Sequence, residues 1–415
     1  MRYVPIVGLM ALGLLPGCYT EVAIDDPDGS PPPWDAAAYL DAGVDGAVPD
    51  ASTAFIPPIG KCVEPTGVDL LLVVDNSNSM TEEQESLAIQ LPSLVRSLID
   101  PPDSDGDGTL DWLPITDLQV GVVTTDMGTG GFTVPTCARS DFGDDGVLRT
   151  IGRTDVAGCM ATYPSFLGFD PMADSPDGFA FDVGCVARTG TGGCGFEQPL
   201  EAALKALSPS TATPSTGPGY EPPVFFRMTF GHADTVNSGF VRDDTLLAVV
   251  LVTDEEDCSA EDPGLFDPTS ATYGSTDLNL RCFAHADEAL QPVERYVRGL
   301  AALRANRPDL LALGLIVGVP ADLAMSQPTD ADFSRILADR RMQETVDPVM
   351  PTRLVPSCNI PGRGVAFPPR RLVQVARELS GHRSTVQSIC QEDFSPAAAA
   401  IARLLGTRAC AAYME

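Results

Sequence analysis

Four runs of apolar residues predict strands that are buried on both faces of a sheet. Each run is rich in Val, Leu and Ile and lacks the alternation of apolar and polar side chains that marks a half-exposed strand. These runs occupy residues 68–74, 118–125, 246–253 and 310–319, and a shorter strand is predicted at 384–389. Strands buried on both faces are typical of parallel sheets, so the pattern favours a parallel arrangement.

Segments with helical spacing of apolar residues alternate with these strands. Residues 81–99 begin with Thr81 and acidic side chains, which favour a helix start, and carry leucines at helical spacing. Pro92 should kink or divide this helix. Further helices are predicted at 199–207, 286–305, 370–379 and 396–405. The alternation predicts an α/β fold with a doubly wound, mostly parallel sheet covered by helices on both faces.

The N-terminal part of the chain lacks this pattern. Residues 1–18 contain an early arginine and a short apolar run, which predict a secretion signal peptide and not a membrane span. Residues 19–61 are dominated by Asp, Ala, Gly and Pro, so we expect a disordered acidic tether. The folded domain is therefore predicted at 62–415. Its expected insertions, braced by disulfides, lie near 127–195, 208–243, 255–284 and 320–367, the first of them irregular.

The apolar run ends in Leu15-Pro16-Gly17-Cys18, which resembles the lipobox of bacterial lipoproteins. The resemblance implies lipidation at Cys18, although Pro16 is less usual there. It also implies a lipid-anchored protein of the bacterial cell envelope, periplasmic or surface-exposed, with the outer membrane favoured over the inner. The alternative is an ordinary signal peptide that is cut elsewhere.

Composition narrows the classes of partner. The 415-residue chain has 57 acidic and 26 basic side chains, which give a formal net charge of −31 at pH 7. This charge repels phosphate backbones and anionic membrane surfaces, so we expect no nucleic-acid partner and contact with a membrane only through the lipid anchor. So many carboxylates also suit divalent cations, although a solubilising surface accounts for most of them.

Eleven cysteines in an exported chain indicate disulfides. Setting Cys18 aside leaves ten, an even number, and no paired CxxC arrangement suggests zinc. Neighbours within the insertions are expected to pair, and the last pair would join the ends of the domain. The expected bridges are Cys137–Cys159, Cys185–Cys194, Cys258–Cys282, Cys358–Cys390 and Cys62–Cys410. Sequence alone leaves other connectivities open.

Two acidic turns directly follow predicted strands. Asp75, Ser77 and Ser79 form a D-x-S-x-S motif after the strand at 68–74, and Asp254 follows the strand at 246–253. In such sheets, ligands bind beyond the carboxyl ends of the strands. Residues two apart in a turn can aim their oxygens at one point, as hard cations such as Mg²⁺ require.

This combination resembles the von Willebrand factor type A (VWA) family and its metal-ion-dependent adhesion site. The resemblance covers most of residues 66–408 and implies a Rossmann-like sheet and a site for Mg²⁺ or Ca²⁺. In the family, residues at the positions of Ser77 and Ser79 bind the ion directly, and the one at Asp254 acts through water. A threonine that the family supplies from the loop before residues 199–207 is missing here, and Glu197 is the nearest oxygen donor. A carboxylate there would favour Ca²⁺ and weaken attraction for an acidic group of a partner.

An aspartate-rich loop is a second candidate cation site. Its carboxylates are Asp103, Asp105, Asp107 and Asp111. Their alternate spacing, with Gly108 in the turn, resembles the short calcium loops of thrombospondin-type and dockerin repeats. Pro114 stands where an EF-hand has its last glutamate. Bound Ca²⁺ would stiffen the link between the first helix and the second strand, and the alternative is a solvated acidic turn.

Together these features predict an envelope-anchored adhesion lipoprotein. It would bind a protein or surface ligand that carries an acidic group, through a divalent metal. No GxSxG or HExxH motif is present, so we expect binding and not catalysis. A metal-dependent hydrolase and a structural envelope component with an incidental metal remain the alternatives.

Overall fold

A computed structural model describes residues 67–411 except 214–215, 217–219, 362–363, 380–382 and 392. These residues belong to one compact unit, Pro58–Glu415. The predicted signal peptide, the tether, lipidation at Cys18 and the Cys62–Cys410 bridge lie outside the described residues. Among the helices that are described, none is both long and apolar enough to cross a membrane.

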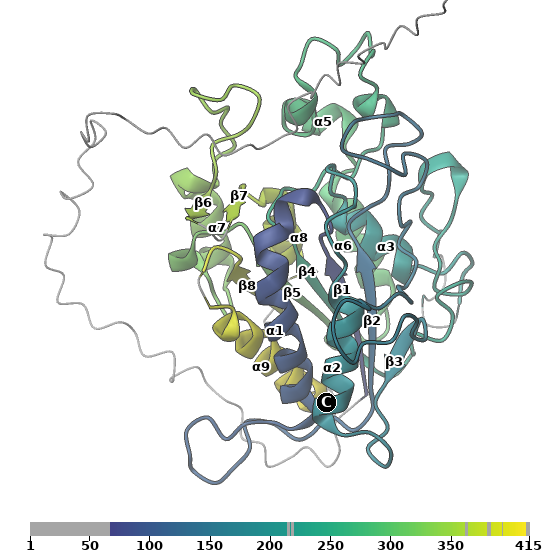
Figure 1. Ribbon diagram of the computed structural model, residues 1–415, viewed down its shortest axis with the longest axis vertical. Coiled ribbons are helices and arrows are strands. Elements are labelled where there is room, and N and C mark those ends of the chain that lie inside the picture. The colour runs from purple at the N-terminus through teal and green to yellow at the C-terminus, as the bar shows by residue number, and fades with distance from the viewer. Residues whose placement is uncertain are drawn as a thin grey trace, which may run out of the picture. The chain divides into compact units, whose positions relative to one another are not determined.

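The unit is built on a six-stranded sheet with the strand order β3-β2-β1-β4-β5-β8 (Figure 1). Five strands run parallel, and β3 pairs antiparallel with β2 at one edge. The parallel strands are β1 (Val68–Val74), β2 (Leu118–Thr124), β4 (Leu246–Val252), β5 (Leu311–Val317) and β8 (Ser384–Ser388), and the edge strand is β3 (Phe166–Gly168). The predicted α/β class with a mostly parallel sheet is confirmed, and the arrangement is compatible with a Rossmann-like fold.

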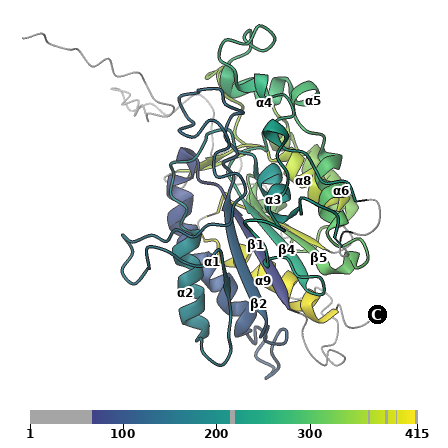
Figure 2. The same cartoon turned by 90° about the vertical axis from the view of Figure 1, so that its right-hand side faces the viewer.

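Helices cover both faces of this sheet (Figure 2). Leu70 and Leu72 of β1 pack on one face with apolar side chains of three helices, while Leu71 and Val73 pack on the other. The first face is covered by α1 (Thr81–Ile99), α2 (Pro176–Ala187) and α9 (Ser395–Ala411), and the second by α3 (Pro199–Leu207), α6 (Val293–Ala302), α7 (Asp330–Ala338) and α8 (Arg370–Glu378). Every residue of β1, β4 and β5 is buried, as the uninterrupted apolar runs predict.

Two prolines act differently from each other in the predicted helices. Pro92 lies inside α1 without dividing it. A Cβ atom added to Gly184 of α2 would lie 2.7 Å from Pro92 Cγ, so the glycine lets α2 pack closely against α1 at this point. The predicted helix at 286–305 is broken instead, into α5 (Ala286–Ala289) and α6, with Pro292 directly before α6.

The predicted insertions contain regular structure. The stretch 127–195, predicted to be irregular, holds both β3 and α2. Ser175 accepts a hydrogen bond from the N–H of Gly178 and Pro176 begins the helix, so α2 has a strong N-terminal cap. Its residues Phe179 and Val183 are buried in the core, and this burial stabilises the helix. Elsewhere the insertions contain α4 (Arg281–Ala284), α7 and a hairpin of β6 (Cys358–Ile360) and β7 (Gly364–Ala366).

Four disulfides join described residues, and two of the predicted pairings are wrong. The bonds are Cys137–Cys194, Cys159–Cys185, Cys258–Cys282 and Cys358–Cys390, of which the last two are as predicted. Cys137 does not pair with Cys159, nor Cys185 with Cys194, because the first insertion folds back on itself. The N–H of Gly195 donates to the carbonyl of Thr136 (3.0 Å), and the N–H of Arg153 donates to that of Cys185 (3.3 Å). The bridge Cys159–Cys185 is therefore nested inside Cys137–Cys194.

Candidate metal site

The order of the strands reverses between β1 and β4, and their carboxyl ends lie side by side at this point. From β1 the chain continues into β2 on one side, and it later returns to β4 on the other side of β1. Ligand sites in doubly wound sheets lie at this reversal. Asp75 directly follows β1, Asp254 follows Thr253 after β4, and the N–H of Asp75 donates to the carbonyl of Val252 (2.9 Å). The two predicted acidic turns therefore stand side by side.

The four residues of the predicted adhesion motif form one hydrogen-bonded group. The carboxylate of Asp75 is fully buried and accepts from the N–H of Ser77 at 2.8 Å. The hydroxyls of Ser77 and Ser79 lie 2.8 Å apart. The Ser79 hydroxyl then donates to Asp254 Oδ1 at 3.2 Å, so it joins two loops that are 175 residues apart in sequence. The structure thus brings Asp75, Ser77, Ser79 and Asp254 together.

Two threonines that sequence reasoning missed fix the orientation of Asp75. The hydroxyl of Thr253 donates to Asp75 Oδ2 at 2.6 Å, and that of Thr125 lies 3.3 Å from Asp75 Oδ1. Both threonines are buried and stand at or beside the last residues of β4 and β2. Their position directly after predicted strands is the sequence signal that could have identified them.

Glu197 also reaches this group. Its side chain is buried in the loop that precedes α3. Burial raises its pKa well above the ordinary value, the nearby charges of Asp75 and Glu255 raise it further, and a hydrogen bond with Ser77 opposes the shift. The residue predicted to replace the missing threonine therefore lies next to the hydroxyl of Ser77.

Five acidic side chains gather at the ends of β1 and β4. Three of them were predicted and two were not: the predicted ones are Asp75, Asp254 and Glu197, and the others are Glu83 and Glu255. Burial raises the pKa of Glu83 to about 7 and that of Glu255 to about 8, and it also raises the pKa of Asp75 and of Asp254. The negative charge of Asp75 adds to the upward shifts of the other three groups. Among the described residues, no Lys or Arg forms an ion pair with any of the five. Asp254 Oδ2 and Glu83 Oε2 are buried without a hydrogen-bond partner. Such a cluster needs protons or a cation to offset its charge.

The chemistry of the donors fits a hard divalent cation. Every side-chain donor in the group is a carboxylate or hydroxyl oxygen, which suits Mg²⁺ and Ca²⁺ and not the softer metals that prefer sulfur or imidazole. The unpartnered Asp254 Oδ2 belongs to the residue that the Ser79 hydroxyl contacts. The residues present therefore fit the ion that the sequence motif implies.

The aspartate-rich loop joins α1 to β2 and brings three of its four predicted ligands together. Carboxylate oxygens of Asp103, Asp105 and Asp107 lie within 4.8 Å of one another and are exposed. Asp111 is turned away from them, because it accepts from the hydroxyl of Ser104 (2.7 Å) and from Arg403 of α9 (2.9 Å). The loop is thus held on α9 by Asp111, and the other three carboxylates accept hydrogen bonds from backbone N–H groups of the loop itself.

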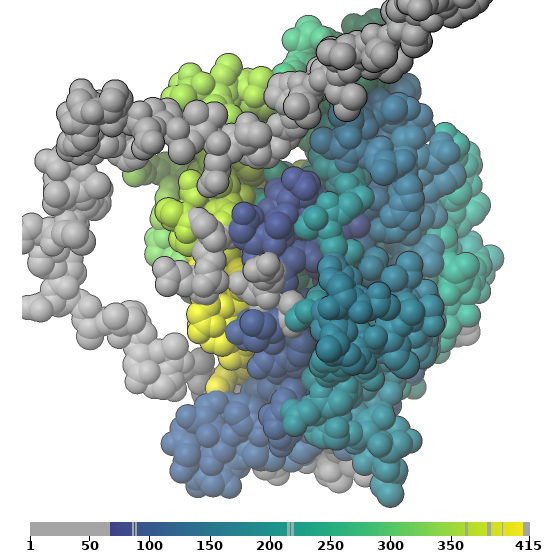
Figure 3. All heavy atoms as spheres, viewed as in Figure 1, coloured from purple at the N-terminus to yellow at the C-terminus, as the bar shows by residue number. Residues whose placement is uncertain are grey.

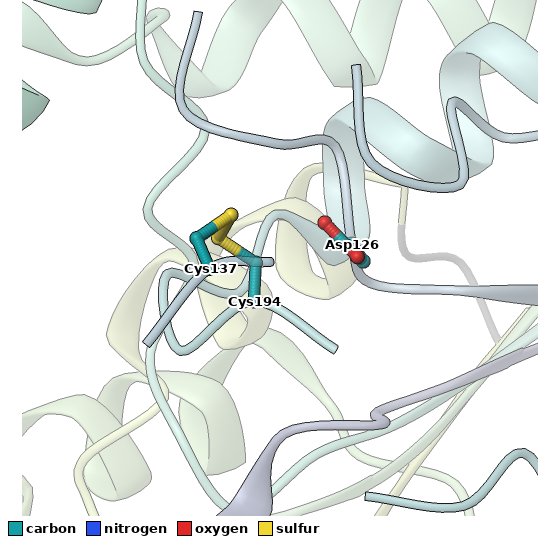
Figure 4. A group of neighbouring side chains, drawn as sticks. All are labelled: Asp126, Cys137 and Cys194. Carbon is teal, nitrogen blue, oxygen red and sulfur yellow. A yellow bond between two sulfur atoms is a disulfide. The ribbon is translucent and has the colours of Figure 1, made fainter. Parts of the chain in front are cut away.

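A further group of ligand-type side chains consists of Asp126, Cys137 and Cys194 (Figure 4). The two sulfur atoms are bonded to each other, whereas a metal ligand needs a thiolate. The carboxylate of Asp126 accepts from the N–H of Gly128 at 3.0 Å and lies 3.4 Å from Arg139. This group is accordingly a structural anchor of the insertion and not a metal site.

Comparison with known proteins assigns neither a family nor a function to this chain. No protein-family model matches the sequence, and no curated protein is matched by it. The functional argument therefore depends on the geometry of the site.

Proposed function

We propose that residues 62–415 form a VWA-like domain that holds one divalent cation, Mg²⁺ or Ca²⁺, and uses it to bind a partner with an acidic group. The observation that carries the proposal is the link from Ser79 to Asp254, whose other carboxylate oxygen is buried without a partner. The position of both loops at the reversal of strand order supports it.

Each residue of the group has a distinct part in this proposal. Ser77 and Ser79 offer hydroxyl oxygens to the cation, and Asp254 faces it directly or through water. Asp75 accepts hydrogen bonds from Ser77 and Thr253, so it orients the first loop as well as supplying charge. Glu197 adds negative charge, which favours Ca²⁺. The bound cation supplies attraction for a carboxylate of the partner.

We further propose that the chain is a lipoprotein of the bacterial cell envelope, lipidated at Cys18 and carrying this domain on the tether at 19–61. The Leu15–Cys18 segment and the composition of the tether support this placement. The four disulfides suit an oxidising compartment outside the cytoplasm.

The test is calorimetric titration of Ca²⁺ and Mg²⁺ into the wild type and into Asp75→Asn, which keeps the size of a fully buried side chain and removes its charge. We expect the variant to weaken cation binding at one site by roughly 10- to 100-fold. Asp287→Asn is the matched control, because Asp287 is exposed on α5. Equal affinity and stoichiometry in wild type and Asp75→Asn would contradict the proposal.

A further inference from the structure

The insertion at 127–195 places arginines beside the candidate cation site. Figure 3 shows this insertion, coloured blue to teal, gathered next to α1. Its basic residues are all arginines, namely Arg139, Arg149, Arg153 and Arg188. The N–H of Arg149 donates to the carbonyl of Val122 (2.8 Å), so Arg149 lies against the last part of β2, the strand next to β1.

The guanidinium group of Arg149 contains a buried nitrogen for which no hydrogen-bond partner is found among the described residues. Its Nε is buried and makes no hydrogen bond. In the described part of the chain, no other basic side chain has a buried nitrogen without a hydrogen-bond partner. No side-chain hydrogen bond or ion pair with a described residue is found for Arg149. This is unexpected in a chain with 57 acidic and 26 basic side chains. A buried donor left unpaired costs free energy. Because Nε is buried, an anion from outside the chain would meet the two Nη atoms, which are not among the buried atoms without a partner.

Two of the neighbouring arginines, Arg139 and Arg153, already have partners. Arg139 pairs with Asp144 and lies 3.4 Å from Asp126. Arg153 makes two hydrogen bonds to Asp155, at 2.8 and 2.7 Å. Burial lowers the pKa of Arg149, Asp144 opposes this shift, and Arg153 and Arg139 add to it, so these three groups lie around it. Arg149 is the member of this group that remains available.

Asp144 connects the arginine group to the cation site. Its Oδ2 accepts from the hydroxyl of Thr124 at 2.6 Å and from the amide of Asn76 at 3.3 Å. Asn76 lies between Asp75 and Ser77 in the D-x-S-x-S motif. The carboxylate beside these arginines is therefore joined by a hydrogen bond to the loop that carries the cation site.

We propose that Arg149 is an anion subsite that binds a second carboxylate of an acidic peptide segment, whose first carboxylate meets the cation. The guanidinium plane matches a carboxylate with two parallel hydrogen bonds. Ile151, two residues after Arg149, is 57% exposed and offers an apolar contact, which favours a peptide over a simple anion. The net charge of −31 repels extended polyanions such as nucleic acid. The cation part of this inference rests on the proposed function.

The test uses the full chain saturated with Ca²⁺ and an N-acetylated, C-amidated tetra-aspartate peptide, with tetra-asparagine as the uncharged control. Calorimetry gives the Kd for wild type, Arg149→Gln and Arg149→Lys. We expect Arg149→Gln to raise the Kd by roughly 10- to 100-fold, and Arg149→Lys to rescue only part of it, because lysine lacks the two-pronged geometry. Arg298→Gln is the matched control: Arg298 lies on α6 with a side chain that is 79% exposed.

Several outcomes decide between the two proposals. Unchanged affinity in Arg149→Gln, or no binding of tetra-aspartate by wild type at millimolar concentration, overturns the arginine subsite. Loss in Arg149→Gln with full binding by wild type in chelator supports the subsite and overturns the cation-dependent function. In a second measurement, the ¹⁵N signal of Arg149 Nε is followed during titration. A shift with tetra-aspartate and none with tetra-asparagine supports direct contact, independently of any variant, and no shift overturns it.

Discussion

The hydroxyl of Ser79 joins the two loops of the candidate site. It contacts Ser77 within its own loop and Asp254 in a loop 175 residues away. The motif in the sequence predicted this meeting, because both loops follow buried strands. Glu83, Glu255 and Arg149 were not predicted, since their relevance depends on burial and on missing partners, which no local pattern records.

Glu197 gives a prediction at the level of a single side chain. Glu197→Thr removes a carboxylate beside Ser77 and leaves a hydroxyl oxygen, so the site should lose preference for Ca²⁺ relative to Mg²⁺ by about tenfold. Competition calorimetry with the two cations measures this ratio. Glu221→Thr, at an exposed loop position, is the control. An unchanged ratio in Glu197→Thr would show that Glu197 does not act on the ion.

Elements with strong periodicity were predictable, and those in the insertions were not. The strand β1 and the helix α3 match their predicted bounds, because continuous apolar runs and helical spacing identify them. The helix α2 was missed, although Ser175 and Pro176 form a recognisable start, because Gly and Asp dominate the surrounding composition. Missing α2 also led to the wrong disulfides, since it is this helix that brings Cys185 to Cys159.

The aspartate-rich loop gives a prediction at the level of an element. If Asp103, Asp105 and Asp107 hold Ca²⁺, the ion stabilises the fold by about 2.7 kcal/mol when its free concentration is 100 times the Kd. The measurement should be made in the Asp75→Asn variant, so that cation binding at the site around Asp75 contributes less to the melting temperature. There, Asp105→Asn with Asp107→Asn should abolish the rise in melting temperature with Ca²⁺, while the amide oxygens still accept the loop hydrogen bonds.

The control for that loop is Asp170→Asn with Asp174→Asn, a pair of exposed aspartates in another turn. A calcium response that persists in the loop variant would mean that the aspartates form only a solvated turn.

At the scale of the whole molecule, the excess of acidic residues makes stability depend on pH in two separate ranges. Asp155 and Asp339, held by Arg153 and Arg341, have a pKa lowered to about 2, so their contribution is lost only in strong acid. The carboxylates at the candidate site behave oppositely, because their pKa values are raised. Between pH 5 and 8 the buried site therefore contributes to the pH dependence, together with Glu256, whose pKa burial raises to about 8.

The last prediction follows from the sign of these shifts. Glu83 and Glu255 have pKa values raised from 4.5 to about 7 and about 8, so the folded state binds their protons more tightly than the unfolded state does. Their stabilising contribution is complete below pH 4.5 and is lost as the pH rises through 7 to 8. In chelator, the melting temperature should fall between pH 5 and 8.5, and Glu83→Gln should reduce this fall whereas Glu261→Gln, at an exposed position, should not. Saturating Ca²⁺ should replace the protons, so the calcium-induced rise in melting temperature should be larger at pH 8 than at pH 5. A melting temperature in chelator that increases over this range would contradict the charge balance inferred for the site.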